Sequence, residues 1–471
     1  MLDTKIGVLV VKRVATVLIL FLFTAIGCRS PEGFEHRLTH QNPCFKSIAS
    51  TQVDSLERIS EANTIDQYVQ LCLERNPQIS EAFHRVEAIR HRIPQSHSLP
   101  DPIVGTTTFL SPVQTAAGKQ TFGLGIQQKI IHAERRATQI SIIREELAAA
   151  EADLIRVHLD LAYQVKMACF QLLFVRQSIA ITEAEIESLK QIADVILRQY
   201  EVQASVTQQD VLNVQIEQSK LDNDLTRLLD REKKHRARLA RLTHLSPASN
   251  LEILDSLKTS EYELDLEALT SRAIASRPEL HAQLANMRRD RKKIHLADLQ
   301  KKPDFSIGMN WISTSDEGIS PLANGQDALS LGIGFNLPIY RNRIRSAVCE
   351  AKAISAATNN RYASLQDQIT EEIFSLIAKA ESERTILELL QQDIIPKANR
   401  TLELAIDEYA NGDAPYVQLI EDWRSLLRYR LSEARSMTEI HLTLASISRS
   451  VGEIDELTDE SLAPNRSAFE E

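Results

Sequence analysis

The feature that most constrains the fold of this chain is an internal duplication. Four landmarks occur in the same order in both halves of the 471-residue sequence. The matched pairs are Leu73 with Ile274, Pro100 with Pro303, Gly125 with Gly334, and Tyr200 with Tyr409. Their separations are 201, 203, 209 and 209 residues, so the constant final offset gives the segment after Gly125 the same length in both halves. The chain is therefore expected to contain two copies of one structural unit.

Each copy contains two segments with the two-residue period of a β-strand. In Ala328–Leu337, large apolar residues alternate with serine, glycine and asparagine, and Asp304–Ser313 repeats the pattern. In the first copy, Ile103–Leu110 and Thr121–Gln128 are predicted strands, joined by a polar loop over 111–120. Alternation places the apolar and the polar residues on opposite faces of a strand. About ten residues is the length of a tilted strand that crosses a bilayer.

The segments around these strands have helical periodicity. A helix is predicted over 64–97, with a kink at Pro94, and a much longer one from 130 to about 200. Apolar residues of the long helix step by three and four, which is typical of a coiled-coil seam. About 70 residues would extend about 100 Å. A further helix is predicted over 209–245, and the two shorter helices of each copy are expected to stack end to end beside the long one.

Four strands in one chain predict an oligomer. Four strands cannot close a barrel, and an open sheet edge is not tolerated in lipid. A dimer would supply 8 strands and a trimer 12, and a barrel of more than about 8 strands encloses a lumen. The fold class expected is mainly α with a transmembrane β-barrel, in which tandem-duplicated long helical hairpins and four strands per chain form part of a tunnel.

Composition and motifs exclude several functions. The net charge of −10, without a basic patch that contains aromatic residues, argues against nucleic acid as a partner. No phosphate-binding glycine loop, nucleophile elbow or zinc-protease motif is present, so we predict neither an enzyme nor a cofactor. His84 and His91 lie seven residues apart on one helical face, but Arg85 and Arg92 beside them favour a solvated basic face over a metal site.

The N-terminus has the pattern of a bacterial targeting segment. Lys12 and Arg13 precede an apolar run over 14–23, which is too short for an ordinary membrane helix. The following residues, 24–28, resemble a lipobox and predict that Cys28 is acylated after cleavage, although Ala25 stands where leucine is usual. An ordinary secretory signal with an incidental cysteine is the alternative.

These observations divide the chain into six parts. They are a signal peptide (1–27), a lipidated tether (28–63), the first repeat (64–245) with its strand pair at 103–128, a linker (246–263), the second repeat (264–452) with its strand pair at 304–337, and an acidic tail (453–471).

The duplicated plan resembles the TolC-type outer-membrane efflux proteins over about residues 64–452. The motifs that carry the resemblance are Asn76-Pro77, Leu99–Pro102, Arg277–Leu280, Leu337–Ile339, Tyr200 to Leu212, and Tyr409 to Ile420. The resemblance implies a homotrimer in the bacterial outer membrane, with a 12-stranded barrel and a periplasmic helical barrel. It also implies the role of exit duct of a tripartite, RND-type efflux pump or a type I secretion system, with a periplasmic adaptor and an inner-membrane pump as partners.

The resemblance further implies that the turns at 201–209 and 410–417 form a periplasmic tip. Its adaptor-binding residues would be Tyr200, Gln203, Val211, Leu212, Tyr409, Gly412 and Leu419. The pore mouth would be ringed by Asp210, Gln418 and Glu421, where a threefold ring of carboxylates favours cations and Gln418 weakens that preference. From the residues alone, Asp210 could equally cap the helix that follows it.

Two positions depart from the symmetry of the repeats. Gln203 stands where the second turn has Gly412, and Lys129 stands where the second strand-to-helix junction has Pro338. The first turn and the first junction are therefore expected to differ from their counterparts. The alternative to a channel is a lipid-anchored periplasmic coiled-coil adaptor that does not span the membrane, which would explain the heptads but not the paired strands.

Overall fold

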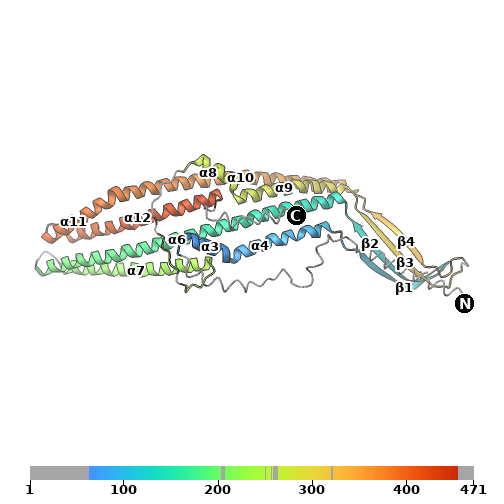
Figure 1. Cartoon of the computed structure of the whole chain (residues 1–471), viewed down its shortest axis with the longest axis horizontal. Coiled ribbons are helices and arrows are strands. Elements are labelled where there is room, and N and C mark those ends of the chain that lie inside the picture. The colour runs from blue at the N-terminus through green and yellow to red at the C-terminus, as the bar shows by residue number, and fades with distance from the viewer. Residues whose placement is uncertain are drawn as a thin grey trace. The chain divides into compact units, whose positions relative to one another are not determined.

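The computed structural model describes residues 63–202, 207–249, 251–255, 257, 264–319 and 322–453. Within them, both repeats have the predicted order of helices, strand pair, long helix and helix (Figure 1). The first repeat contains α3 (Ile65–Arg75), α4 (Pro77–Arg90), α5 (Arg92–His97), β1 (Ile103–Thr115), β2 (Gly118–Ile130), α6 (Ala133–Val202) and α7 (Gln208–Leu242). The second contains α8 (Leu266–Ser276), α9 (Pro278–Asp298), the 3-10 turn η5 (Leu299–Lys301), β3 (Phe305–Thr314), β4 (Ala328–Phe335), α10 (Arg341–Leu389), the π-helical turn η6 (Leu390–Ile394), α11 (Ile395–Asn411) and α12 (Tyr416–Val451).

The long helices confirm the expected length. The α6 helix has 70 residues, which corresponds to about 105 Å at 1.5 Å per residue. Its counterpart runs from the start of α10 to the end of α11, with the five-residue π-turn η6 between them. The π-turn was not expected from the sequence, because a single wide turn leaves the apolar periodicity nearly unchanged.

The shorter helices stack end to end along the long ones. The α6 helix packs against α3, α4 and α9, and also against α7 and α12. The amide of Asn76, between α3 and α4, donates to the carbonyl of Leu242 at the end of α7, at 2.8 Å. The equivalent junction of the second repeat joins Arg449 of α12 to Glu279 of α9, at 2.6 Å. The end-to-end arrangement is thus confirmed in both repeats.

The first predicted helix is divided where the sequence analysis expected continuity. It breaks at Asn76, whose backbone is extended and whose side chain accepts from the N–H of Gln78. Proline disfavours a helical conformation in the residue before it, so Pro77 begins a new helix. A second break occurs at His91, and Pro94 lies in the first turn of the short helix α5, where a proline is tolerated.

The four strands form one antiparallel sheet in the order β1-β2-β3-β4. The predicted loop over 111–120 is wrong, because β1 extends to Thr115 and β2 begins at Gly118. An irregular register between Thr108 and Val113 bends the pair there, and it interrupts the alternation from which the strand ends were predicted. The two strand-to-helix junctions differ as expected, with two residues after β2 and five after β4.

Candidate functional site

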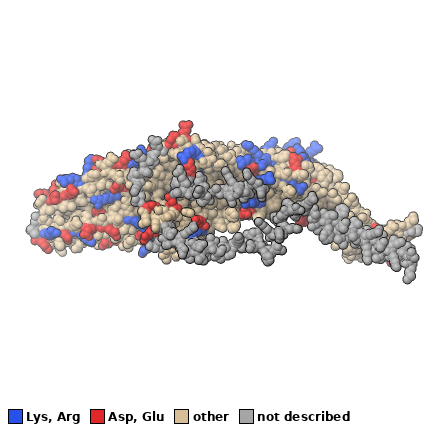
Figure 2. Space-filling model, in the orientation of Figure 1, with Lys and Arg blue, Asp and Glu red and all other residues tan. Residues whose placement is uncertain are grey.

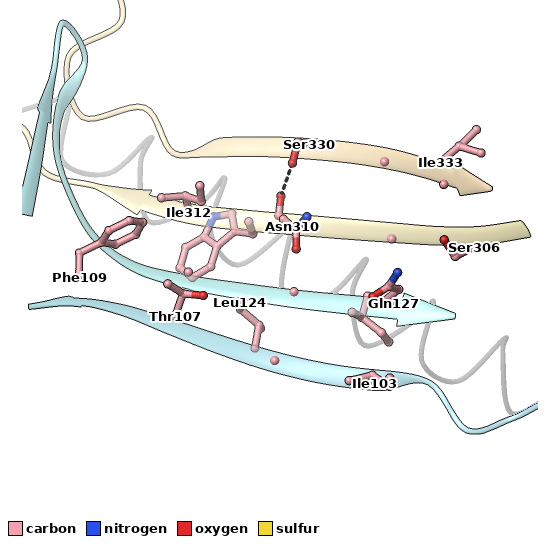
Figure 3. Close-up of a pocket in the computed structure, with 18 residues that line it drawn as sticks. Ile103, Thr107, Phe109, Leu124, Gln127, Ser306, Asn310, Ile312, Ser330 and Ile333 are labelled. Atoms are coloured by element: carbon pink, nitrogen blue, oxygen red, sulfur yellow. Dashed lines mark hydrogen bonds between the residues drawn. The ribbon is translucent and has the colours of Figure 1, made fainter. Parts of the chain in front are cut away.

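One face of the sheet carries mostly small and polar side chains, although Ile103, Phe109 and Ile312 also line it. The strand register places Gly105, Gly125, Asn310 and Ser330 in one row across all four strands. These and neighbouring residues line a hollow of about 590 Å³, in which the hydroxyl of Ser330 lies 3.5 Å from the carbonyl of Asn310 (Figure 3). Side chains of this size leave room for water and solutes, as the interior of a wide barrel does.

The opposite face is apolar and exposed. On β4, Leu329, Leu331 and Ile333 are 61%, 70% and 69% exposed. Further along the same face, the rings of Phe122 and Trp311 pack edge to face with their centroids 6.4 Å apart. A contiguous apolar surface of this kind is unfavourable in water and suits the hydrocarbon of a bilayer.

Both edges of the sheet are open within the described residues. β1 pairs only with β2, and β4 pairs only with β3. The backbone N–H and C=O groups along each outer edge therefore lack a strand partner in one chain, which cannot persist in lipid.

The second turn of the tip, between α11 and α12, is set by Gly412. Its φ of 84° is left-handed, its N–H donates to the carbonyl of Tyr409 at 3.1 Å, and the N–H of Asp413 donates to Glu408 at 2.9 Å. These two bonds form a Schellman motif, which ends a helix and requires the left-handed conformation that glycine adopts without strain.

Replacing Gly412 by valine should therefore loosen this turn. A left-handed conformation costs a β-branched residue about 1–2 kcal/mol, and asparagine far less. We expect faster amide hydrogen exchange over 405–420 in Gly412→Val, and exchange close to that of the wild type in Gly412→Asn. Equal protection in both variants would contradict a conformational role for this glycine.

Asp210 caps the helix that follows the first turn. Its carboxylate accepts from the backbone N–H and the hydroxyl of Thr207, at 3.0 and 2.8 Å, and the Thr207 hydroxyl accepts from the N–H of Asp210. This reciprocal pair is a capping box. Asp210 was considered either as a residue of the pore mouth or as a helix cap, and its hydrogen bonds are those of a helix cap.

The two turns lie together through a shared apolar core. Tyr409, Leu419 and Trp423 are 5%, 0% and 1% exposed in a cluster that also contains Ile196 of α6. Val211 packs against this cluster. Burial, together with the negative charge of Asp210, raises the pKa of the Tyr409 hydroxyl to about 12. Tyr409 and Leu419 thus contact other parts of their own chain, and they bear on the tip by positioning its helices.

The charges at the predicted mouth are more balanced than the sequence analysis assumed. The exposed amide of Gln418 donates to both carboxylate oxygens of Asp422, at 3.0 and 2.9 Å. Glu421 forms ion pairs with Arg424 and Arg428, at 3.3 and 3.1 Å. Asp422 and both arginines are not among the predicted mouth residues, although spacings of three, four and seven residues could have indicated them.

Arg424 also reaches into the interior of the tip. Its guanidinium donates to the buried carboxylate of Glu217 on α7, at 2.7 Å, so it links α7 to α12. Burial alone would raise the pKa of Glu217, but the donors of Arg424 and Lys220 lower it below its usual value. Glu217 therefore stays ionised and keeps the two helices joined.

The remaining predicted residues fall into three groups. Tyr200 and Leu212 are 45% and 52% exposed, so they are free for contact outside this chain. Gln203 and Cys28 lie outside the described residues. The two histidines considered for a metal site, His84 and His91, are both exposed.

The duplication, the two-faced sheet and the long helices agree with one known family. The model of the outer membrane efflux proteins matches residues 68–243 and 269–453, one segment in each repeat and more than half of the chain. The chain belongs to the outer membrane efflux protein family. It is accordingly an outer-membrane efflux channel, and the alternative of a coiled-coil adaptor that does not span the membrane is wrong.

Solved structures share the fold of this outer membrane efflux protein. The outer-membrane channel OprN superimposes with a TM-score of 0.70 at 19% identity, covering 84% of this chain and 91% of that one. VceC from Vibrio cholerae superimposes with a TM-score of 0.69 at 18% identity, covering 82% of this chain and 96% of that one. The CmeC channel of Campylobacter jejuni has a TM-score of 0.67 at 16% identity, covering 82% of this chain and 85% of that one. A comparison with curated proteins finds no significant match. OprN and CmeC are described as outer-membrane channels.

Proposed function

We propose that three copies of this chain close one 12-stranded barrel in the outer membrane and form the exit duct of a tripartite, RND-type efflux pump or a type I secretion system. The observation that carries the proposal is the sheet with two open edges, an apolar face and a polar hollow. Pairing β1 of one copy with β4 of the next satisfies both edges at once, and a ring of such contacts closes on itself. Twelve strands leave a lumen, which the polar face would line.

The helices would continue the duct into the periplasm. Each copy would supply a long helix pair with shorter helices beside it, so the wall would have similar thickness along its length. The open flanks of the helices carry exposed apolar side chains, such as Phe83 on α4 and Phe374 on α10, at 48% and 60% exposure. Contact between neighbouring copies would bury them.

The tip would be the part that meets an adaptor protein and through it an inner-membrane pump. Tyr200, Leu212 and Val417 are apolar, exposed and close to the two turns, so they supply a surface for a partner helix. Asp210, Gln418 and Glu421 would line the mouth, with Asp422 as a further carboxylate. Acylation of Cys28 would add a lipid anchor in the same membrane.

The native mass in mild detergent tests this proposal. We expect a mass near three chains after correction for bound detergent, and a tip variant such as Leu212→Asp to weaken adaptor binding while the mass stays the same. A Cys28→Ser variant should still require detergent for extraction. A monomer, or a Cys28→Ser protein that is released without detergent, would refute a spanning trimer.

A further inference from the structure

A second hollow lies where the sheet meets the helices. It has a volume of about 700 Å³. Four helical segments contribute to its wall: α5, the start of α6, the end of α9 with η5, and the start of α10. Asn336 also lines it, and continues the polar face of β4 beyond Ser330 and Gly334. The hollow therefore opens on the same side of the sheet as the polar face.

Three arginines line this hollow, and no carboxylate does among the described residues. They are Arg135 and Arg136 of α6 and Arg343 of α10, and no Asp or Glu is among the described lining residues. Arg135 already has partners for its guanidinium, which donates to both carboxylate oxygens of Asp304 and to the carbonyls of Leu299 and Lys302. Arg135 thus fixes the wall, and the other two arginines remain for a ligand.

Arg136 and Arg343 have no acidic partner among the described residues. Arg136 donates from Nη1 to the carbonyl of His97 at 3.1 Å, and its buried Nε has no hydrogen-bond partner. Arg343 is exposed on the first turn of α10. Partly burying a guanidinium without a counter-charge is unfavourable, and a bound anion would relieve it.

The start of α10 also favours a bound anion. The helix begins with Arg341 and Arg343, has no acidic residue in its first turn, and lacks a side-chain cap. Basic residues at a helix N-terminus oppose the helix dipole, so this end favours a negative charge that the chain itself does not supply. Lys and Arg side chains also gather over the ends of α9 and α10 nearest the strands (Figure 2).

The rest of the wall indicates the kind of anion. Leu99, Pro100, Ile131 and Leu296 line the hollow beside the arginines. A volume of several hundred Å³ with an apolar wall and a few charged donors is typical of a site for a small organic molecule. Arginine is suited to carboxylate, sulfonate and phosphate groups, which it binds with paired N–H donors.

We propose that this hollow binds organic anions with an apolar body, and that three such sites ring the duct where the barrel joins the helices. The position in the duct rests on the proposed function, because the polar face is a lumen only in a closed barrel. The duct would then hold anionic cargo at this level.

Calorimetric titration of the full-length protein in nonionic detergent at low salt tests the site. The probe is 1,5-naphthalenedisulfonate, and the cation benzyltrimethylammonium serves as its counterpart. We expect the dianion alone to bind, and Arg136→Gln and Arg343→Gln each to weaken it about tenfold, the effect of one charge-assisted hydrogen bond. Arg345→Gln, two residues along α10 and outside the hollow, should bind like the wild type.

Equal affinity in Arg343→Gln and the wild type would overturn the proposal, and so would an equal loss in Arg345→Gln. Because Arg343 is exposed, that variant keeps the test valid even where Arg136→Gln misfolds. Conductance measured in planar bilayers tests the proposed duct independently of the anion site. Dianion binding by a protein that shows no conductance would support the anion site and refute the proposed duct. Conductance in a protein that binds no dianion would support the duct and refute the anion site.

Discussion

Replacing Leu331 by arginine is expected to prevent assembly in the outer membrane. Leu331 lies in the middle of β4 on the apolar face and is 70% exposed in the single chain. An arginine at the midplane of a barrel's lipid-facing surface costs about 2–4 kcal/mol, and a trimer would carry three of them. We expect the heat-resistant oligomer on semi-native gels to be lost and the protein to be missing from outer-membrane fractions.

The neighbouring residue provides a matched control. Ser330 lies one position earlier on the same strand but lines the polar hollow, so Ser330→Arg places the same charge in the proposed lumen. That variant should assemble normally and alter the conductance instead. If both variants assembled equally well, the apolar face would not be in lipid. If both failed, charge on β4 would be harmful on either face, and the assignment of a lumen would be wrong.

The contrast between these two residues also explains why the sheet could be predicted so well. The side-chain period of two assigns every residue of β3 and β4 to a face, and the register confirms the assignment from Phe305 to Phe335. The same alternation predicted the second strand of the first repeat, where Phe122, Leu124 and Ile126 alternate with glycine and glutamine. The prediction failed over 111–120, which was predicted as a loop, because the irregular register between Thr108 and Val113 breaks the alternation without leaving a signal in residue type.

The site was predicted less completely, because its properties depend on contacts between distant segments. Gly412 could be identified from the sequence, since the turn it makes is local. The burial of Tyr409 and Leu419 could not, because it arises where α11 and α12 pack on α6. The basic hollow escaped prediction for the same reason. Arg136 and Arg343 are about 200 residues apart in the chain, and only the fold brings them to one wall.

The largest effect expected on the helices comes from a buried ion pair between the repeats. Glu185 of α6 is 1% exposed, and its carboxylate accepts from Nη1 of Arg430 on α12 at 2.5 Å. Arg430 also donates to Asn399 of α11, at 3.0 Å, so three helices meet at this pair. Arg430→Met would leave a buried carboxylate without its partner, and we expect a loss of about 3 kcal/mol in unfolding free energy.

The stability of the variant should also depend more steeply on pH. Burial raises the pKa of Glu185, although Arg430 acts in the opposite direction. A carboxyl whose pKa is higher in the folded than in the unfolded state favours folding at low pH and loses that contribution as the pH rises through the folded value. Without Arg430 the rise is larger, so Arg430→Met should be more stable at pH 5 than at pH 8.

Denaturant unfolding of the helical circular dichroism signal measures both effects, and two further variants identify their cause. Glu185→Gln combined with Arg430→Met removes the buried charge, and it should recover most of the lost stability and abolish the added pH dependence. Arg428→Met removes an arginine two residues away whose side chain is 66% exposed and pairs with Glu421 at the surface, so it should change stability by less than about 1 kcal/mol. Failure of the double variant to recover would mean that the cavity left by Arg430, and not the unpaired carboxylate of Glu185, destabilises the junction of the three helices.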